Sequence, residues 1–333
     1  MDFDKLIIRY RQFGGLRLVW EYAKLGVSLV VAKGFFLCLY KQRSFKAIYP
    51  KVLRKIEPYL VKRYSSLVQE FNSSRCSSLP HEHPKVIWWC WLQGKEQAPP
   101  IVKACFNSLL QEFKSLRNQE AQGSNEEYEI KVIDVGNWND YVELPEYIVK
   151  KWEKKQIPPA LFSDLLRLEL LIKYGGTWID STVLCTGNVN DNHNENFLNA
   201  DLFVFQYTRP GEKWSGNISN WFISAHSNNE VLMVLRDMLF AYWKDYNCTL
   251  DYYIFHLFFA MVAKEYPEQI AAMPYGQSQN SLVLLHHWGE KFEQKKWDKL
   301  TSQVCFHKLA FRVSKETVES KGNFYQKILE NYK

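Results

Sequence analysis

Residues 163–182 have the sequence SDLLRLELLIKYGGTWIDST, and their pattern decides the fold. Apolar side chains recur at the spacing of one face of an amphipathic helix: Leu161, Leu165, Leu168 and Ile172. Gly175 and Gly176 are expected to end that helix, because glycine readily adopts the left-handed backbone conformation found at helix C-termini. Residues 177–180 then predict a buried strand that ends at Asp180. A helix, a glycine turn and a strand therefore follow one another here.

The same alternation continues on both sides of this segment. Apolar runs predict strands at residues 85–92, 128–134, 202–207 and 220–225. Helical patterns are expected at about 101–116, 145–155, 230–243 and 250–264, and the last should be buried because its apolar residues lie all around. Strands that alternate with helices predict an α/β domain with a largely parallel sheet.

Charge separates the beginning of the chain from the rest. The net charge of the 333 residues is +6, yet residues 1–70 hold 14 Lys and Arg against 5 Asp and Glu. We therefore predict a basic helical segment over 1–75, followed by the α/β domain. The Ser-rich stretch 72–84 is the expected linker.

A basic segment indicates an anionic partner, either nucleic acid or an acidic membrane surface. Residues 15–40 are rich in Leu, Val, Phe and Trp but are interrupted by charges, so they fall short of a spanning helix. An amphipathic or half-inserted helix at the inner membrane surface fits better, although an ordinary helical subdomain stays open. No nucleic-acid-binding motif occurs, so no nucleic-acid partner is expected.

Cysteine usage and the N-terminus predict the compartment. The seven cysteines are odd in number and scattered, and no C-x-x-C occurs, which is typical of a reducing compartment. The first residues, MDFDKLIIRYRQ, carry acids and lack a signal cleavage site. We expect a cytoplasmic protein that associates peripherally with the cell membrane.

Three side chains of the central segment can carry chemistry. Asp164 and Arg167 share one helix face because they are three residues apart. The glycine turn can bring Asp180 to the end of the sheet, where open α/β folds bind ligands. A carboxylate there can hold a divalent cation that neutralises a leaving diphosphate, and Arg167 can add a charge-assisted contact. The plain alternative is that Asp164 and Arg167 form an ion pair on the helix surface and that Asp180 caps a turn.

The pattern D-x-x-R-x(7)-G-G-x-x-x-D-x-[D/T] resembles the sugar-binding region of glycosyltransferases with a DXD motif. More closely, the chain resembles the capsular polysaccharide synthesis proteins related to glycosyltransferase family 32. PKVIWWCW (84–91), NWFISA (220–225), DYYIFH (251–256) and HKL (307–309) resemble other stretches of those enzymes in the same order. The resemblance covers about residues 82–312, which it implies form a Rossmann-like nucleotide-binding domain; residues 313–333 are then the expected helical tail.

The resemblance implies a GT-A fold, a nucleotide-sugar donor that is most often UDP-linked, Mn²⁺ or Mg²⁺, and retention of the anomeric configuration. It implies that Trp91 stacks on the base, that Asp164 binds ribose or donor sugar, and that Arg167 contacts the donor. Gly176 belongs to the same predicted donor-binding group. Arg167, Asp180 and Asp251 are the predicted catalytic residues.

The resemblance also supplies the predicted metal site. Asp180 corresponds to the first Asp of the DXD motif, and Thr182 stands where the second Asp is expected; a neutral hydroxyl is a weaker ligand than a carboxylate. His307 and Lys308 are the C-terminal candidates for the metal and the diphosphate. Asp251 begins the predicted helix 250–264, either as its N-cap or on the acceptor side.

The predicted activity is transfer of a hexose to a lipid-linked saccharide acceptor in capsular or surface polysaccharide synthesis. Retention needs either a carboxylate nucleophile or attack on the same face as the leaving group. No carboxylate stands out as a nucleophile, so we favour same-face attack. Two alternatives remain: transfer to a protein or another glycolipid, and a protein that binds nucleotide sugars without turnover.

Overall fold

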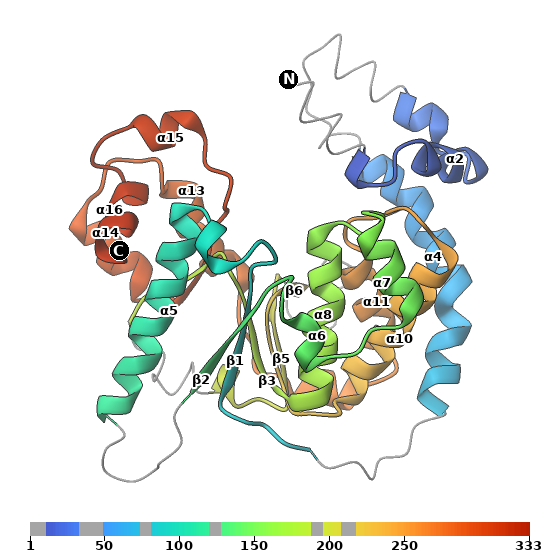
Figure 1. Cartoon of the computed structure of the whole chain (residues 1–333), viewed down its shortest axis with the longest axis horizontal. Coiled ribbons are helices and arrows are strands. Elements are labelled where there is room, and N and C mark those ends of the chain that lie inside the picture. Colours follow the sequence, from blue (N-terminus) through green and yellow to red (C-terminus); the bar gives the residue numbers. More distant parts are fainter. Residues whose placement is uncertain (1–10, 33–48, 74–80, 120–127, 188–195, 208–217) are drawn as a thin grey trace. The chain divides into compact units, whose positions relative to one another are not determined.

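The computed structural model describes residues 11–32, 49–73, 81–119, 128–187, 196–207 and 218–333 (Figure 1). The chain divides into two compact units, each built from three sequence segments. A helical unit comprises Met1–Ser78, Glu143–Leu168 and Glu230–Pro267. A sheet unit comprises Leu79–Val142, Glu169–Asn229 and Glu268–Lys333. The predicted basic segment is therefore grouped with two later segments.

The helical unit is built around packed helices. These are α2 (Leu16–Lys24), α4 (Tyr49–Ser73), α7 (Glu146–Glu153), the first part of α8 (Pro159–Tyr174), α10 (Glu230–Asp245) and α11 (Ile254–Val262). Helix α10 packs against α4, α7 and α11. Within this unit the ring centroids of Tyr64 on α4 and Phe258 on α11 are 5.2 Å apart. The Tyr64 hydroxyl donates to Asp245 at 2.7 Å, and Arg63 pairs with the same carboxylate at 2.9 Å.

Helix α8 confirms the helix predicted from the central segment, and its predicted stripe is buried. The burial extends further than one stripe, since Phe162, Leu166, Leu170 and Leu171 are also buried. The helix is therefore covered around most of its circumference. The polar side chains of Asp164 and Arg167 are buried with it, at 6% and 3% exposure. A surface ion pair, the plain alternative, does not describe them.

The sheet unit contains a five-stranded sheet in the order β2-β1-β3-β6-β5. Its strands are β1 (Val86–Cys90), β2 (Glu129–Ile133), β3 (Gly176–Asp180), β5 (Leu202–Gln206) and β6 (Ile218–Ala225). Strand β1 pairs in parallel with β2 and β3, whereas β6 runs antiparallel to both β3 and β5. Four of the five strands thus point the same way. This mostly parallel α/β sheet is consistent with the predicted Rossmann-like GT-A fold.

A two-stranded sheet follows β3 directly. Its strands, β4 (Val183–Cys185) and β7 (Phe306–Lys308), run antiparallel. The helices described in this unit, together with the end of α8, are α5 (Pro100–Gln119), α6 (Trp138–Tyr141), α12 (Pro267–Ala272), α13 (Ser278–His287), α14 (Gln294–Thr301), α15 (Lys315–Glu319) and α16 (Phe324–Asn331). Helix α5 packs on β4 and α16, and α13 packs on β7. Figure 1 shows the C-terminal helices gathered beside α5.

The turn between α8 and β3 requires both of its glycines. Gly175 and Gly176 have φ angles of 73° and 92°, where a side chain is strained. A Cβ on Gly175 would lie 2.4 Å from the carbonyl oxygen of Glu82, and one on Gly176 would lie 2.6 Å from that of Val86. Close backbone packing at the start of the sheet therefore explains Gly176; its predicted place in donor binding stays a prediction.

The helix expected at 250–264 begins four residues later, at Ile254. Asp251 is not its N-cap; the cap position is Tyr253. The Asp251 carboxylate instead accepts a hydrogen bond from the Tyr253 backbone N–H at 2.9 Å. This local turn competes with the helix, as Asp side chains commonly do. In the described part of the chain, no helix is long and apolar enough to cross a membrane.

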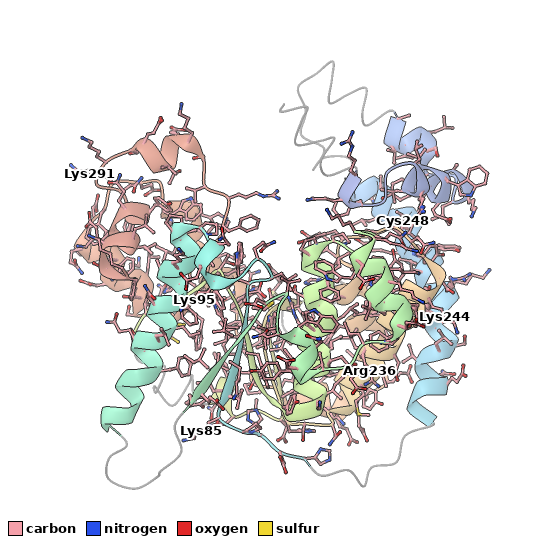
Figure 2. The ribbon with its side chains drawn as sticks, viewed as in Figure 1. Lys85, Lys95, Arg236, Lys244, Cys248 and Lys291 are labelled. Atoms are coloured by element: carbon pink, nitrogen blue, oxygen red, sulfur yellow. The ribbon has the colours of Figure 1, made fainter. Side chains whose placement is uncertain are left out.

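The cysteines in the described ranges, Cys90, Cys105, Cys185, Cys248 and Cys305, are all free and buried. Cys38 and Cys76 lie outside the described residues. Cys248, labelled in Figure 2, packs against the start of the helical unit: a Cβ on Gly14 would lie 2.4 Å from the Cys248 Cβ. The neighbouring Thr249 N–H donates to the Phe13 carbonyl at 2.9 Å. These contacts tie the segment before α2 to this unit.

Candidate functional site

The carboxyl ends of β1 and β3 lie next to each other in the sheet unit. Cys90, the last residue of β1, is paired in register with Asp180, the last residue of β3. Trp91 follows Cys90, and Thr182 follows Asp180 by two residues. This edge is where open α/β sheets bind ligands. The structure therefore brings three predicted site residues, Trp91, Asp180 and Thr182, to adjacent strand ends.

The Asp180 carboxylate is held by two donors. Trp178 Nε1 donates to Oδ1 at 2.9 Å, which is possible because residues two apart on a strand share one face. Lys308 Nζ donates to Oδ2 at 2.8 Å. The same ammonium donates to Thr182 Oγ1 at 2.5 Å. Lys308 therefore bridges the Asp180 carboxylate and the Thr182 hydroxyl, the two groups predicted to form a DXD-like motif.

Pairing of β4 with β7 places Lys308 there. Val183 and Lys308 are register partners, and the Leu309 N–H donates to the Thr182 carbonyl at 2.8 Å. Lys308 is thereby fixed beside the turn that follows β3. The side chains of Asp180 and Lys308 keep 24% and 21% of their surface exposed. Since both charged groups remain accessible, a ligand can reach the pair.

The structure does not join His307 to this cluster. Neighbouring residues on a strand point to opposite faces, and His307 is only 1% exposed. Its Nε2 is 2.8 Å from Thr186 Oγ1. Burial lowers the pKa of His307 to about 4, so the imidazole is neutral at pH 7. His307 is therefore a buried bridge between β7 and the end of β4.

The residues around Asp180 do not fit the divalent cation that the resemblance implies. Among the described residues, no three His, Cys, Asp or Glu side chains gather in a group that could hold a metal ion. A divalent cation on Asp180 would lie within about 4 Å of the Lys308 ammonium, where the two repel by about 8 kcal/mol at an effective dielectric constant of about 20. A metal ion and the Lys308 ammonium would thus occupy the same position beside the Asp180 carboxylate.

An aromatic pair lies at the same edge of the sheet unit. The rings of Trp91 and Phe311 meet edge to face, with centroids 5.6 Å apart. The Trp91 Nε1 makes no hydrogen bond within the described part of the chain, although it is buried. Phe311 is 43% exposed, and the Arg312 guanidinium lies over its ring at 5.1 Å. Flat faces of this kind suit a nucleobase.

Asp164 and Arg167 form a second polar cluster, in the helical unit. Arg167 Nη1 is 3.2 Å from Asp164 Oδ1, and Nη2 donates to Ser163 Oγ at 3.3 Å. The guanidinium carbon lies 5.9 Å from the ring centroid of Phe255. Burial and the positive charge of Arg167 lower the pKa of His256 to about 4. Arg167 is thus a buried cation that is paired with Asp164 and lies near a neutral His256.

Asp251 lies in the turn before α11, also in the helical unit, and is 1% exposed. Two tyrosine hydroxyls donate to backbone carbonyls just before it: Tyr22 to Leu250 at 3.0 Å and Tyr242 to Cys248 at 2.9 Å. Burial, followed by the Asp251 charge, raises the pKa of Tyr22. These contacts fix the backbone just before Asp251, and the catalytic part of Asp251 stays a prediction.

The sequence analysis missed two residues of the sheet-unit site. Trp178 orients Asp180, and its position two residues earlier on a strand was the available signal. Phe311 lies three residues after Lys308 and contacts Trp91. No local pattern marks Phe311, because its importance depends on how the C-terminal segment returns to the sheet.

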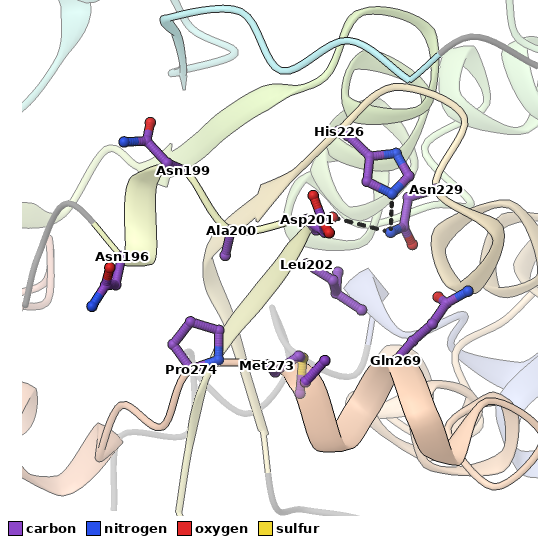
Figure 3. Close-up of a pocket in the computed structure, with 11 residues that line it drawn as sticks. Asn196, Asn199, Ala200, Asp201, Leu202, His226, Asn229, Gln269, Met273 and Pro274 are labelled. Atoms are coloured by element: carbon purple, nitrogen blue, oxygen red, sulfur yellow. Dashed lines mark hydrogen bonds between the residues drawn. The ribbon is translucent and has the colours of Figure 1, made fainter.

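A cavity of about 770 Å³ lies at the other edge of the sheet (Figure 3). Asp201 precedes the first residue of β5, and His226 follows the last residue of β6. Asn229 Nδ2 donates to the Asp201 carbonyl at 3.1 Å and is 3.3 Å from His226 Nε2. None of the sequence-predicted site residues lines this cavity. Its polar groups serve the chain connections at the amino ends of the parallel strands.

Comparison with known proteins finds a matching family and similar solved structures. The family model described as "Capsular polysaccharide synthesis protein" matches residues 38–328. Among solved structures, the one titled "PaToxG Glycosyltransferase" is 16% identical with a TM-score of 0.37, and the match covers 83% of this chain and 97% of that one. No curated protein matches the chain. The family match includes both polar clusters and the β4–β7 pair.

Proposed function

The chain belongs to the family of capsular polysaccharide synthesis proteins, and from that premise we propose that it transfers a hexose from a UDP-sugar to an acceptor. Membership of this family supports glycosyltransferase activity. The observation that carries the proposal is the cluster of Asp180, Thr182 and Lys308 at the carboxyl end of β3. An accessible ammonium at this edge suits the diphosphate of a nucleotide sugar.

The proposed donor fits the groups at this edge. The Lys308 ammonium stabilises negative charge on the departing nucleoside diphosphate, which is the charge that develops as the sugar leaves. The ring of Trp91, beside Phe311, offers a face for the base. Retention by same-face attack remains our proposal for the stereochemistry, with the leaving phosphate accepting the acceptor's proton.

The proposed acceptor is a lipid-linked saccharide at the inner membrane surface. Support comes from α2, where Leu16, Val19 and Trp20 are 81%, 47% and 64% exposed. Their spacing puts them on one face of the helix, and Lys24 lies over the Trp20 ring at 5.6 Å. The opposite side holds Tyr22, whose hydroxyl donates to Leu250. Such a helix can lie in a membrane interface with its apolar face towards the lipid acyl chains.

A screen of nucleotide sugars that measures nucleoside diphosphate release tests the proposal, and Asp180→Ala is its decisive variant. We expect the variant to lose transfer almost completely, because Lys308 loses its fixed partner. Little stability should be lost, since the carboxylate is 24% exposed. Asp298→Ala, which removes an exposed acid on α14 of the same unit, is the matched control.

Near-normal turnover by Asp180→Ala would show that the site is assigned wrongly. If the wild-type chain binds a nucleotide sugar but releases no diphosphate with saccharide, protein or glycolipid acceptors, it is a binding protein without turnover. Release with a protein or another glycolipid as acceptor would keep the reaction and replace the lipid-linked substrate. Proton NMR of the product's anomeric signal distinguishes retention from inversion.

A further inference from the structure

The Lys308 ammonium occupies the position between the two side chains of the DXD-like motif. It contacts Asp180 Oδ2 at 2.8 Å and Thr182 Oγ1 at 2.5 Å, two oxygens that would otherwise face a cation. We propose that Lys308 replaces the divalent cation, so that donor cleavage by this chain is independent of metal. The inference rests on the proposed function and names the group that neutralises the leaving diphosphate.

The charges support this assignment. A motif with two carboxylates is matched by a divalent cation, whereas this motif has one carboxylate and one neutral hydroxyl. One ammonium balances one carboxylate. The Asp180 oxygens are also both engaged by hydrogen-bond donors, Trp178 at Oδ1 and Lys308 at Oδ2. Thr182 completes the arrangement, because its hydroxyl oxygen accepts from Lys308 where a second carboxylate would favour a metal ion.

Lys308 also retains the capacity to bind a ligand. An ammonium group has three N–H donors, and two of them go to Asp180 and Thr182. Within the described residues no third acceptor is recorded, and the side chain is 21% exposed. The third N–H is therefore available to a diphosphate oxygen. Asp180 acts in this arrangement as a positioning residue that holds the ammonium in place.

The chemical step needs no further reagent. The bond between the sugar C1 and the β-phosphate oxygen breaks, and its electron pair stays on the phosphate beside Lys308. The acceptor hydroxyl oxygen bonds to C1 and its proton passes to the leaving phosphate. Lys308 remains an ammonium throughout, and it stabilises the charge without donating its proton.

Diphosphate release from the UDP-sugar that the screen identifies, measured in EDTA and in Mn²⁺, tests the inference. We expect the wild-type rates in the two conditions to agree within about twofold. Lys308→Ala should lower kcat/KM by about 100-fold, the usual loss when one group that stabilises a developing charge is removed. Lys308→Arg should recover part of it. Lys315→Ala removes an exposed lysine of α15 and should leave the rate unchanged.

Turnover that stops in EDTA and returns with Mn²⁺ would overturn the inference and leave the proposed function intact. If no donor is cleaved in either condition, the proposed function fails. Binding of Mn²⁺ alone to the full chain, followed by electron paramagnetic resonance, then decides the inference. Tight Mn²⁺ binding that Asp180→Ala removes contradicts it, whereas absence of such binding to the wild-type chain supports it.

Discussion

Arg167 is held by contacts that depend on the shape of its guanidinium. One nitrogen meets Asp164 at 3.2 Å, another meets Ser163 at 3.3 Å, and the plane lies near the Phe255 ring. A lysine ammonium is a point charge and cannot make these contacts together. The charge would survive a change to lysine, but the geometry of the cluster would not.

We therefore expect Arg167→Lys to lower kcat/KM for transfer by about 100-fold, the loss expected when a positioned charged group is misplaced. Donor titration with steady-state rates measures the effect, beside a urea denaturation curve for stability. Arg236→Lys, which changes an arginine paired with Asp237 on α10, is the control. If Arg167→Lys unfolds at lower urea yet keeps its turnover, Arg167 serves only the structure.

Single residues were predictable where a local rule applied. Asp180 was found because a charged residue ended a buried strand, and Asp164 and Arg167 because a three-residue spacing pairs side chains on a helix. His307 was assigned to the metal from resemblance alone. A three-residue strand does not reveal which side chain faces its partner, and only the pairing with β4 decides between His307 and Lys308.

The β4–β7 pair has a pH-sensitive element in His307. Its pKa is about 4 in the folded chain and about 6.5 when unfolded, because burial disfavours the charged imidazole. Between these values the unfolded chain binds the proton and the folded chain does not. The contribution of His307 to the free energy of unfolding is therefore fully present above about pH 6.5. It decreases by about 3 kcal/mol as the pH falls towards 4.

We expect His307→Gln to flatten the pH dependence of the free energy of unfolding between pH 6.5 and 4. Urea denaturation at several pH values measures it. His286→Gln, at an exposed position on α13, is the control and should leave the slope unchanged. His256 has a similarly lowered pKa, so part of the slope should persist in the variant. An unchanged slope in His307→Gln would contradict the buried, neutral state.

Secondary structure was predictable to different degrees. The helix α8, the Gly-Gly turn and β3 follow from periodicity and backbone sterics within one short segment. The direction of β6 does not, because a buried strand has the same apolar pattern whether it runs parallel or antiparallel. The late start of α11 also escaped prediction, since the Asp251 turn competes with the helix for the same backbone groups.

At the scale of the whole molecule, the exposed face of α2 leads to a test of membrane association. We expect the double variant Leu16→Ser and Trp20→Ser to bind vesicles containing phosphatidylserine at least 10-fold more weakly, because two exposed apolar side chains are lost. Vesicle sedimentation at low and high salt measures the binding. Val318→Ser, at an exposed apolar position on α15, is the control.

Equal sedimentation of the double variant and the wild-type chain would rule out α2 as the contact. Loss of binding in Val318→Ser as well would indicate general exposure of apolar surface. The remainder of the predicted amphipathic stretch, residues 33–40, lies outside the described residues. The test is therefore confined to side chains with a known exposed position.

The grouping of the helices was the least predictable feature. Charge and a Ser-rich stretch divided the chain after residue 75, yet α4 packs with α10 and α11 in one unit. An apolar helix face indicates that the helix packs against another element, but it does not identify that element. Partners far apart in sequence are decided by the complementarity of whole surfaces, which no local window contains.

Lys308 lies 128 residues after Asp180, so the ribosome synthesises Asp180 well before Lys308. Trp178, Asp180 and Thr182 emerge from the exit tunnel while β7 has not yet been synthesised. The nascent chain can pair β1 with β3, but Asp180 can form its ion pair only after Lys308 has been synthesised. Chains that end before Phe306 therefore contain Asp180 and Thr182 without Lys308, and the proposed function predicts that they are inactive.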